Sequence, residues 1–427
     1  MKKPTALFIA SVMVLSLAAC GKDTEGEEAV TNQNVQVQTN AAEEETSVKE
    51  TEEPTVDPTI ESTPEPTVEP TQQSVTFEEP AIEDFTYSYD AVLEGIKITG
   101  YTGGAQAIRI PAEIDDEPVR GISLAKNLSI TQIELPDSVT SIVDSAFSGC
   151  SSLIEIIIPD SVTSIGDRAF QKCSSLIEIT IPDGVTSIGE NAFERCSSLT
   201  EITILGNVTS IGDGAFYECS SLTEITIHGN VTSIGVYAFG YCSSLRNITL
   251  PDGVTSIGDS AFYECSSLTE ITIPDGVTSI GRGAFAVCSN LTEITIPDGV
   301  TSIGYGTFVG CSSLTEITIL GNVTSIGEMA FQDCSSLRNI TLPDSVTSIG
   351  ECAFEGCGSL TEITIPDGVT SIGWYAFRYC SSLRNIALPD SVTFIGQGVF
   401  AGCDGLTVTY QGQEYNYAND PGNWWIG

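Results

Sequence analysis

The chain has 427 residues, and its 16 lysines and arginines against 57 aspartates and glutamates give a formal net charge of −41. Nucleic-acid binding needs basic side chains that neutralise phosphates, so this composition excludes nucleic acid as an expected partner. The chain has one histidine, His228, which argues against histidine-dependent catalysis and histidine metal sites.

The amino terminus has the layout of a bacterial lipoprotein signal. Two lysines follow the first methionine, and the apolar stretch at residues 6–17 is too short for a comfortable transmembrane helix. The run Leu-Ala-Ala-Cys that ends at Cys20 resembles the lipobox, whose cysteine is lipidated when the peptide is cleaved before it. Residues 1–19 are therefore predicted to be a signal peptide, and Cys20 is predicted to be a lipidation site that holds the protein at the membrane.

Residues 20–83 are predicted to form a disordered, acidic tether behind the lipidated cysteine. Glu, Thr, Pro, Gln and Ser dominate this stretch and cannot bury a core. Prolines and like charges extend such a chain, so the segment is expected to space the rest of the protein from the membrane. The alternative, a binding motif within the tether, is less favoured because acidic Pro/Thr tracts are usually linkers.

A unit of 23 residues then repeats without insertion, with one cysteine in each unit from Cys150 to Cys403. In the unit that begins at Cys196, a period of two predicts a short strand, a Gly-Asn turn follows, and Gly-x-x-Ala-Phe predicts a turn or short helical piece. One unit cannot bury its apolar residues alone, so neighbouring units must stack into a solenoid. The inward-facing residues of this unit are predicted to be Leu199, Ile202, Ile204, Val208, Ile211, Ala215 and Phe216.

The unit L-x-x-I-x-I-P-x-x-V-x-x-I-G-x-x-A-F-x-x-C resembles the BspA-like, Treponema-type leucine-rich repeat. The resemblance runs from about Ile108 to the carboxyl terminus. It implies a leucine-rich-repeat solenoid with one parallel strand per repeat, and extracellular surface proteins, some of them similar to adhesins that bind host matrix proteins. A repeat motif describes a scaffold and names no ligand.

The repeats also suggest where the solenoid begins and ends. Residues 84–126 are expected to form an amino-terminal cap, residues 127–403 the solenoid, and residues 404–427 a capping hairpin that turns at Gln411-Gly412-Gln413.

Three columns of chemically suggestive residues favour structural roles. The repeat cysteines are expected to form a buried thiol ladder, with disulfides or metal sites as the less favoured alternative. Recurrent Asp residues are explained by turns and recurrent Glu residues by a solvated strand face. The extra cysteine of the array, Cys352, lies at a variable position and is expected to be an exposed thiol. No catalytic residue, metal site or cofactor is predicted.

The candidate ligand-binding residues come from the few positions that vary between units. These positions follow Ile-Gly and Ala-Phe, and aromatic and arginine side chains are enriched at binding hot spots. Packing of these side chains on neighbouring turns is an equally favoured explanation, and the strand face is a competing binding surface. The candidates are Tyr217, Tyr237, Tyr241, Tyr263, Tyr305, Trp374, Tyr375, Arg378 and Tyr379.

These features predict a non-catalytic recognition or adhesion lipoprotein, exposed at the bacterial cell surface. Its expected partners are an extracellular protein or glycan, from host matrix or a neighbouring cell, and the membrane through the lipid on Cys20. The alternative is a structural spacer of the cell envelope without a specific ligand. An enzyme or a solute-capturing transport subunit is disfavoured, since no convergent polar site is evident in the sequence.

Overall fold

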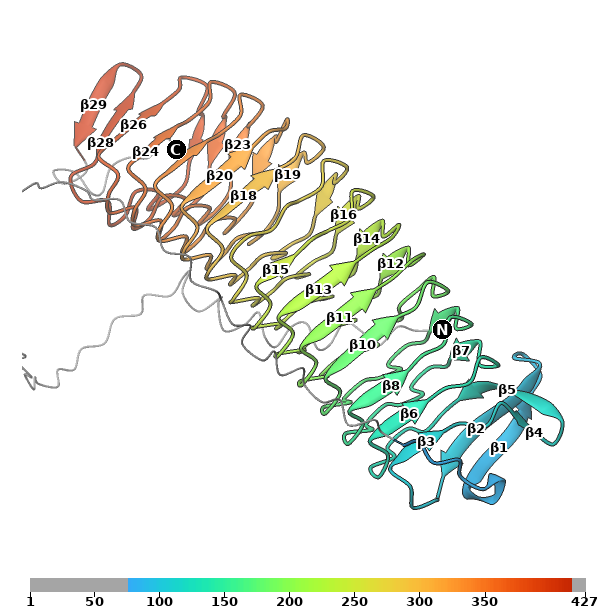
Figure 1. The fold of residues 1–427 in the computed structure, drawn as a ribbon. Coiled ribbons are helices and arrows are strands. Elements are labelled where there is room, and N and C mark those ends of the chain that lie inside the picture. Colours follow the sequence, from blue (N-terminus) through green and yellow to red (C-terminus); the bar gives the residue numbers. More distant parts are fainter. Residues whose placement is uncertain (1–75, 417–427) are drawn as a thin grey trace, which may run out of the picture. The chain divides into compact units, whose positions relative to one another are not determined.

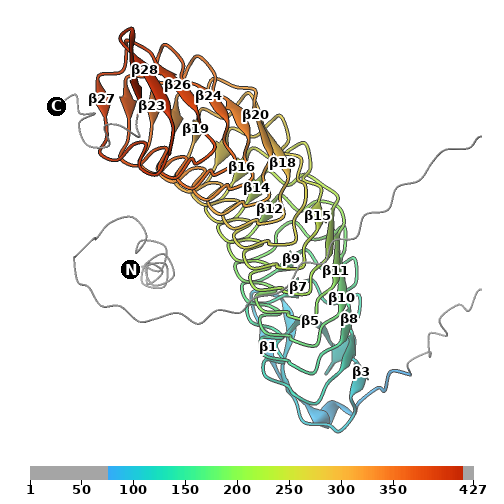
Figure 2. The same ribbon diagram turned by 90° about the vertical axis from the view of Figure 1, so that its left-hand side faces the viewer.

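The computed structural model describes residues 76–416. The predicted signal peptide, Cys20 and nearly all of the predicted tether lie outside the described residues, as do the last eleven residues. The described part is a stack of similar turns, each placed beside the next along the array (Figures 1 and 2). Among the described residues, no helix is long and apolar enough to cross a bilayer.

Each turn buries the residues that the repeat predicts. In the turn that begins at Cys242, the cysteine and seven apolar residues are at most 6% exposed: Leu245, Ile248, Leu250, Val254, Ile257, Ala261 and Phe262. These positions belong to a single core that runs through the whole array. The solenoid prediction is therefore confirmed, because no turn has a core of its own and each is completed by its neighbours.

A ladder of parallel strands runs along one side of the array. Its register is kept by the period, so that Ile202 lies between Ile179 and Ile225 in the adjacent strands. The strands are β3 (Ala107–Arg109), β6 (Gln132–Glu134), β8 (Glu155–Ile157), β10 (Glu178–Ile181), β11 (Glu201–Ile204), β13 (Glu224–Ile227), β15 (Asn247–Ile248), β18 (Glu293–Ile296), β20 (Glu316–Ile319), β22 (Asn339–Thr341), β24 (Glu362–Thr364), β26 (Asn385–Leu388) and β28 (Thr407–Tyr410).

The turns that follow β5 (Glu117–Ile122) also contribute a short segment, Ser-Ile in all but the last, to a second ladder. This ladder divides between β17 and β19, which are not paired, so the turns separate slightly on this side. Its two-residue strands are β7 (Ser141–Ile142), β9 (Ser164–Ile165), β12 (Ser210–Ile211), β14 (Ser233–Ile234), β16 (Ser256–Ile257), β17 (Ser279–Ile280), β19 (Ser302–Ile303), β21 (Ser325–Ile326), β23 (Ser348–Ile349), β25 (Ser371–Ile372) and β27 (Phe394–Ile395).

Antiparallel pairs close both ends of the array. At the start, the 3-10 helix η2 (Ile82–Asp84) leads into a pair formed by β1 (Phe85–Asp90) and β2 (Gly95–Tyr101), and β4 (Glu113–Ile114) pairs with β5. At the other end, β28 turns back into β29 (Gln413–Asn416). These pairs cover the first and last turns, whose apolar faces have no further repeat to stack on.

The largest core side chains form a continuous column of phenylalanines from Phe147 to Phe400. Consecutive rings lie 5.1–5.8 Å apart between centroids, with interplanar angles of 2–20°. Such offset stacking adds to the energy of burial. The column fixes the spacing of the turns at their bulkiest point.

The twelve repeat cysteines form a second buried column, and none of these twelve is in a disulfide. Each Sγ donates to a backbone oxygen 26 residues earlier, as Cys265 does to Phe239 O at 3.1 Å. The same oxygen accepts the backbone N–H of Cys242. The thiol therefore uses the second lone pair of a buried carbonyl, which explains a cysteine at this position better than redox or metal chemistry does.

Because the repeat thiols are buried, the array should lose stability at alkaline pH. Burial raises the pKa of Cys150 to about 11 and those of Cys219 and Cys311 to about 12, from an ordinary value near 9. Thiols in the unfolded chain ionise first, so the free energy of unfolding should be constant up to about pH 8 and should fall as the pH rises through 9 towards 12. The loss is up to about 1.4 kcal/mol per thiol and pH unit. Urea titrations at pH 7, 9 and 10 would measure it.

The same burial predicts that iodoacetamide at pH 8 leaves the twelve thiols unmodified in the folded protein and alkylates them in urea, as read by mass spectrometry. Alkylation of the native protein at these positions would contradict both the protection from iodoacetamide and the expected loss of stability at alkaline pH.

Cys352 is fully buried, so the expectation that it is exposed is wrong. The residue at the same place in the preceding turn, Met329, is also buried. Ser260 at the same place of an earlier turn is buried as well, so this position is not always exposed although it varies between units.

Candidate functional site

The variable residues of the repeat lie on tight turns, and most of their side chains reach solvent. In each turn two residues, one before Ala-Phe and one before the cysteine, have a positive φ, for example Tyr237 (53°) and Tyr241 (61°). The amide of Tyr241 donates to Tyr263 O in the next turn at 2.7 Å. The residues before the cysteines all reach solvent, whereas Met329 and Cys352, which lie before Ala-Phe, are buried.

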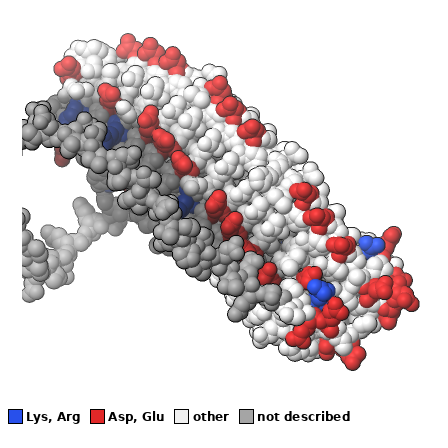
Figure 3. Space-filling model, in the orientation of Figure 1, with Lys and Arg blue, Asp and Glu red and all other residues white. Residues whose placement is uncertain are grey.

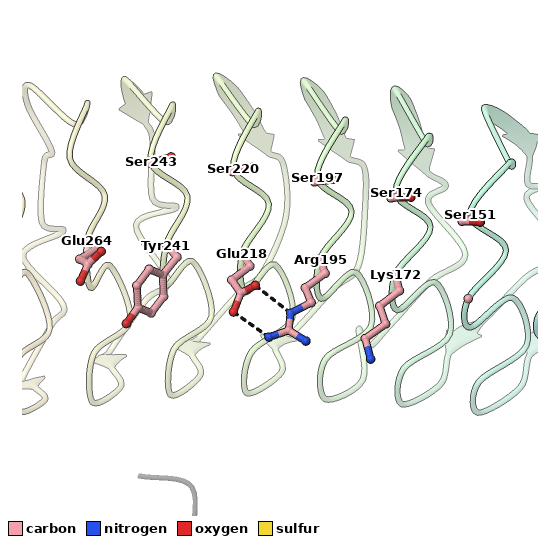
Figure 4. Close-up of a pocket in the computed structure, with 11 residues that line it drawn as sticks. Ser151, Lys172, Ser174, Arg195, Ser197, Glu218, Ser220, Tyr241, Ser243 and Glu264 are labelled. Atoms are coloured by element: carbon pink, nitrogen blue, oxygen red, sulfur yellow. Dashed lines mark hydrogen bonds and ion pairs between the residues drawn. The ribbon is translucent and has the colours of Figure 1, made fainter. Parts of the chain in front are cut away.

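A groove of about 910 Å³ runs across several of these turns (Figure 4). Its wall is the column of residues that precede the cysteines, and serines that follow the cysteines line the other side. The charged and aromatic side chains along the wall are Lys172, Arg195, Glu218, Tyr241 and Glu264. The serines are Ser151, Ser174, Ser197, Ser220 and Ser243.

Charge changes along this groove. Arg195 forms a two-pronged pair with Glu218, with nitrogen–oxygen distances of 2.7 and 3.0 Å. Lys172 is exposed and makes no ion pair with any described residue. The groove therefore has a basic end and an end that carries a tyrosine and two carboxylates.

Four of the predicted tyrosines form one cluster, the tyrosine cluster, beside the second half of the groove. The rings of Tyr217 and Tyr241 meet edge to face with centroids 5.4 Å apart, and those of Tyr241 and Tyr263 are 5.2 Å apart. Tyr237 contacts Tyr217 and Tyr263 at 5.8 and 6.1 Å. Burial raises the pKa of Tyr217, Tyr241 and Tyr263, so these phenols stay neutral at ordinary pH.

A second cluster, the arginine cluster, is built on Arg378. Its guanidinium lies over the rings of Tyr375 and Tyr379, 5.1 and 4.6 Å from their centroids, and donates to Tyr379 Oη at 3.0 Å. It also pairs with Glu355 at 3.3 Å. Trp374 and Tyr379 remain 53% and 51% exposed. Stacking and ion pairing hold Tyr375, Arg378 and Tyr379 in a preformed arrangement.

Tyr305 joins neither cluster, because its hydroxyl donates to Met329 Sδ at 3.3 Å. The positions that vary between units indicate the aromatic residues, but four charged residues of the groove wall are not among the predicted candidates: Lys172, Arg195, Glu218 and Glu264. These residues all precede a repeat cysteine, and this spacing by whole repeats could have indicated that they form one row.

The strand face is acidic, as Figure 3 shows by rows of Asp and Glu along the array. Glu178, Glu201 and Glu224 lie directly beside one another on β10, β11 and β13. Like charges in register repel, which disfavours this ladder as a built site. Within residues 76–416, no group of three or more His, Cys, Asp or Glu side chains is arranged to hold a metal ion.

Comparison with known proteins agrees with this architecture. The family model described as the BspA type leucine-rich repeat region, in six copies, matches residues 123–246, 209–337 and 301–418. No curated protein matches the chain.

Two solved structures are similar over most of their length. A leucine-rich repeat protein from Bacteroides ovatus is 30% identical, with a TM-score of 0.53, over 77% of this chain and 99% of that one. A leucine rich cell surface protein from Faecalibacterium prausnitzii is 32% identical, with a TM-score of 0.50, over 78% and 95%. The chain therefore belongs to the BspA-type leucine-rich repeat family.

Proposed function

We propose that this protein is a non-catalytic recognition lipoprotein, anchored through Cys20 and displayed at the bacterial cell surface, which binds an extracellular protein or glycan. Solenoids present extended surfaces suited to binding. Support for display comes from the lipobox-like run and from the similar protein that is named a cell surface protein.

The observation that carries the proposal is the arginine cluster. An otherwise uniform array gathers Trp374, Tyr375, Arg378 and Tyr379 on two adjacent tight turns, with large exposed rings and a stacked guanidinium. Residues of this kind dominate binding energy when a partner buries them. Turn geometry alone does not require aromatic residues here, since glycine fills the equivalent positions Gly398 and Gly402 one turn later.

The test is capture of extracellular matrix proteins and arrayed glycans by the full-length protein. A saturable ligand should lose at least tenfold in affinity when Trp374, Tyr375 and Tyr379 are changed to alanine, since each hot-spot truncation costs about 2 kcal/mol or more. Tyr89→Ala, at an exposed tyrosine of the amino-terminal cap, is the matched control and should bind normally. A protein that binds no ligand at all would instead fit a structural spacer. Lipid anchoring is tested separately, because Cys20→Ala should release the protein from the membrane fraction.

A further inference from the structure

The groove of Figure 4 allows the proposed function to be sharpened into a ligand class, and the inference rests on that function. We infer that the groove binds an extended acidic oligosaccharide, with a carboxylate or sulfate group at its basic end and sugar rings along the serines towards Tyr241. Four observations carry the inference.

The first observation is a gap between two unpaired lysines. Lys126 lies one turn before Gly149 and two turns before Lys172 at the same position of the repeat, just beyond the residues that line the groove. A Cβ at Gly149 would lie 3.4 Å from Lys126 Cγ, so the stem of the lysine lies beside the glycine. Both lysines are exposed and neither pairs with a described carboxylate. Two ammonium groups can therefore approach one anion placed above Gly149.

The second observation is the row of serine hydroxyls along the groove. Between Ser151 and Ser243 the groove serines make no side-chain hydrogen bond within the described residues, whereas Ser266 and Ser289, farther along the same column, donate to the preceding turn at 3.4 Å. The groove thus offers one free donor and acceptor per turn, about every 4.8 Å. A ligand dense in hydroxyl groups can use such a row.

The third observation is that the backbone of the groove wall is already paired. The amide of Lys172 donates to Glu194 O at 2.7 Å, and the amide of Arg195 donates to Tyr217 O at 2.7 Å. A peptide that binds by adding a strand needs unpaired backbone groups. The wall lacks them here, which favours a glycan over an extended peptide.

The fourth observation is the aromatic end. The ring of Tyr241 lies on the groove wall and is held edge to face between Tyr217 and Tyr263. A fixed, half-buried ring gives an apolar surface on which the C–H face of a sugar can pack, while its neighbour Glu264 can accept hydrogen bonds from sugar hydroxyls. Lys172 and Tyr241 are three turns apart, about 14 Å, which matches a short oligosaccharide.

Isothermal titration calorimetry with the full-length protein tests the inference. The acidic probes are hexasaccharides of galacturonate and of hyaluronan, the neutral probe is the methyl ester of the galacturonate hexamer, and hexaglutamate represents an acidic peptide. At least one acidic sugar should bind more tightly than the neutral ester. Lys172→Gln should weaken binding of the acidic sugar about tenfold, the expected value of one lost charged hydrogen bond, and Lys172→Arg should retain it.

Tyr241→Ala should weaken binding of the acidic sugar and of the neutral ester alike. Arg338→Gln, which removes an exposed cation from the strand face, should change nothing.

Equal affinity for acidic and neutral sugars, or no affinity for either acidic sugar, would overturn the inference. Stronger binding of hexaglutamate that depends on Lys172 would assign the groove to peptides instead. A protein that binds another ligand through Trp374 and Tyr379 but ignores the acidic sugars would keep the proposed recognition function and lose this inference alone.

Discussion

Replacement of Phe262 by alanine is expected to lower the free energy of unfolding by about 3–5 kcal/mol, the usual cost of a large cavity in a well-packed core. The ring is fully buried and stacks on Phe239 and Phe285, with both centroids at 5.3 Å. Because each turn contacts only its neighbours, the cavity should also uncouple the two halves of the array. Urea unfolding followed by circular dichroism should therefore show an earlier transition and a lower m-value.

The matched control is Phe394→Ala, which removes the same ring from a position that is 48% exposed. Its effect should stay within about 0.5 kcal/mol, as for most surface changes. Equal losses at the two positions would mean that the phenylalanine column does not hold the turns together.

Gly258→Ala is expected to destabilise the protein by about 1–3 kcal/mol, in the range of overpacked cores. A Cβ at this position would lie 2.7 Å from the carbonyl carbon of Gly235 and from the amide nitrogen of Val236. Both are backbone atoms of the preceding turn and cannot rotate away, so adjacent turns must separate. Thermal unfolding of the variant would measure the loss.

Gly304→Ala places the same methyl group at the same point of the repeat, where β17 and β19 are unpaired. Its nearest atoms would be Thr307 Oγ1 at 3.5 Å and Ile280 O at 3.9 Å. There the methyl group fits, and the loss of backbone freedom in the unfolded chain should make the change neutral or stabilising by up to about 1 kcal/mol. If both alanines were tolerated, close approach of the backbones would not be the reason for glycine in this column.

The solenoid could be predicted because the same pattern of apolar residues is repeated many times. Leu, Ile, Val, Ala, Phe and Cys recur every 23 residues, and stacking is the arrangement that buries them all. The Ser-Ile ladder was not predicted, since two residues are too few to show the period of a strand. The break between β17 and β19 does not follow from the strand residues themselves, because Ser279-Ile280 and Ser302-Ile303 are identical, although the second of these turns has Thr307 where the repeat usually has alanine.

The site was less accessible to prediction than the fold. Variable aromatic residues could be found by comparing units, but their grouping depends on side-chain directions. The edge-to-face contact of Tyr217 with Tyr237 joins different columns of neighbouring turns. The positive φ of the variable positions is indicated in the sequence, since glycine recurs there at Gly283, Gly306 and Gly310. The groove itself required the three-dimensional placement of the serine and wall columns.

The unbroken register has a consequence for how such a chain changes over generations. Every turn offers its neighbour the same apolar surface, so a gained or lost block of 23 residues leaves each remaining turn with an equivalent partner. Even the two end rings of the phenylalanine column, Phe147 and Phe400, are both buried. The length of the array can thus vary by whole turns of about 4.8 Å, independently of the side chains that individual turns display.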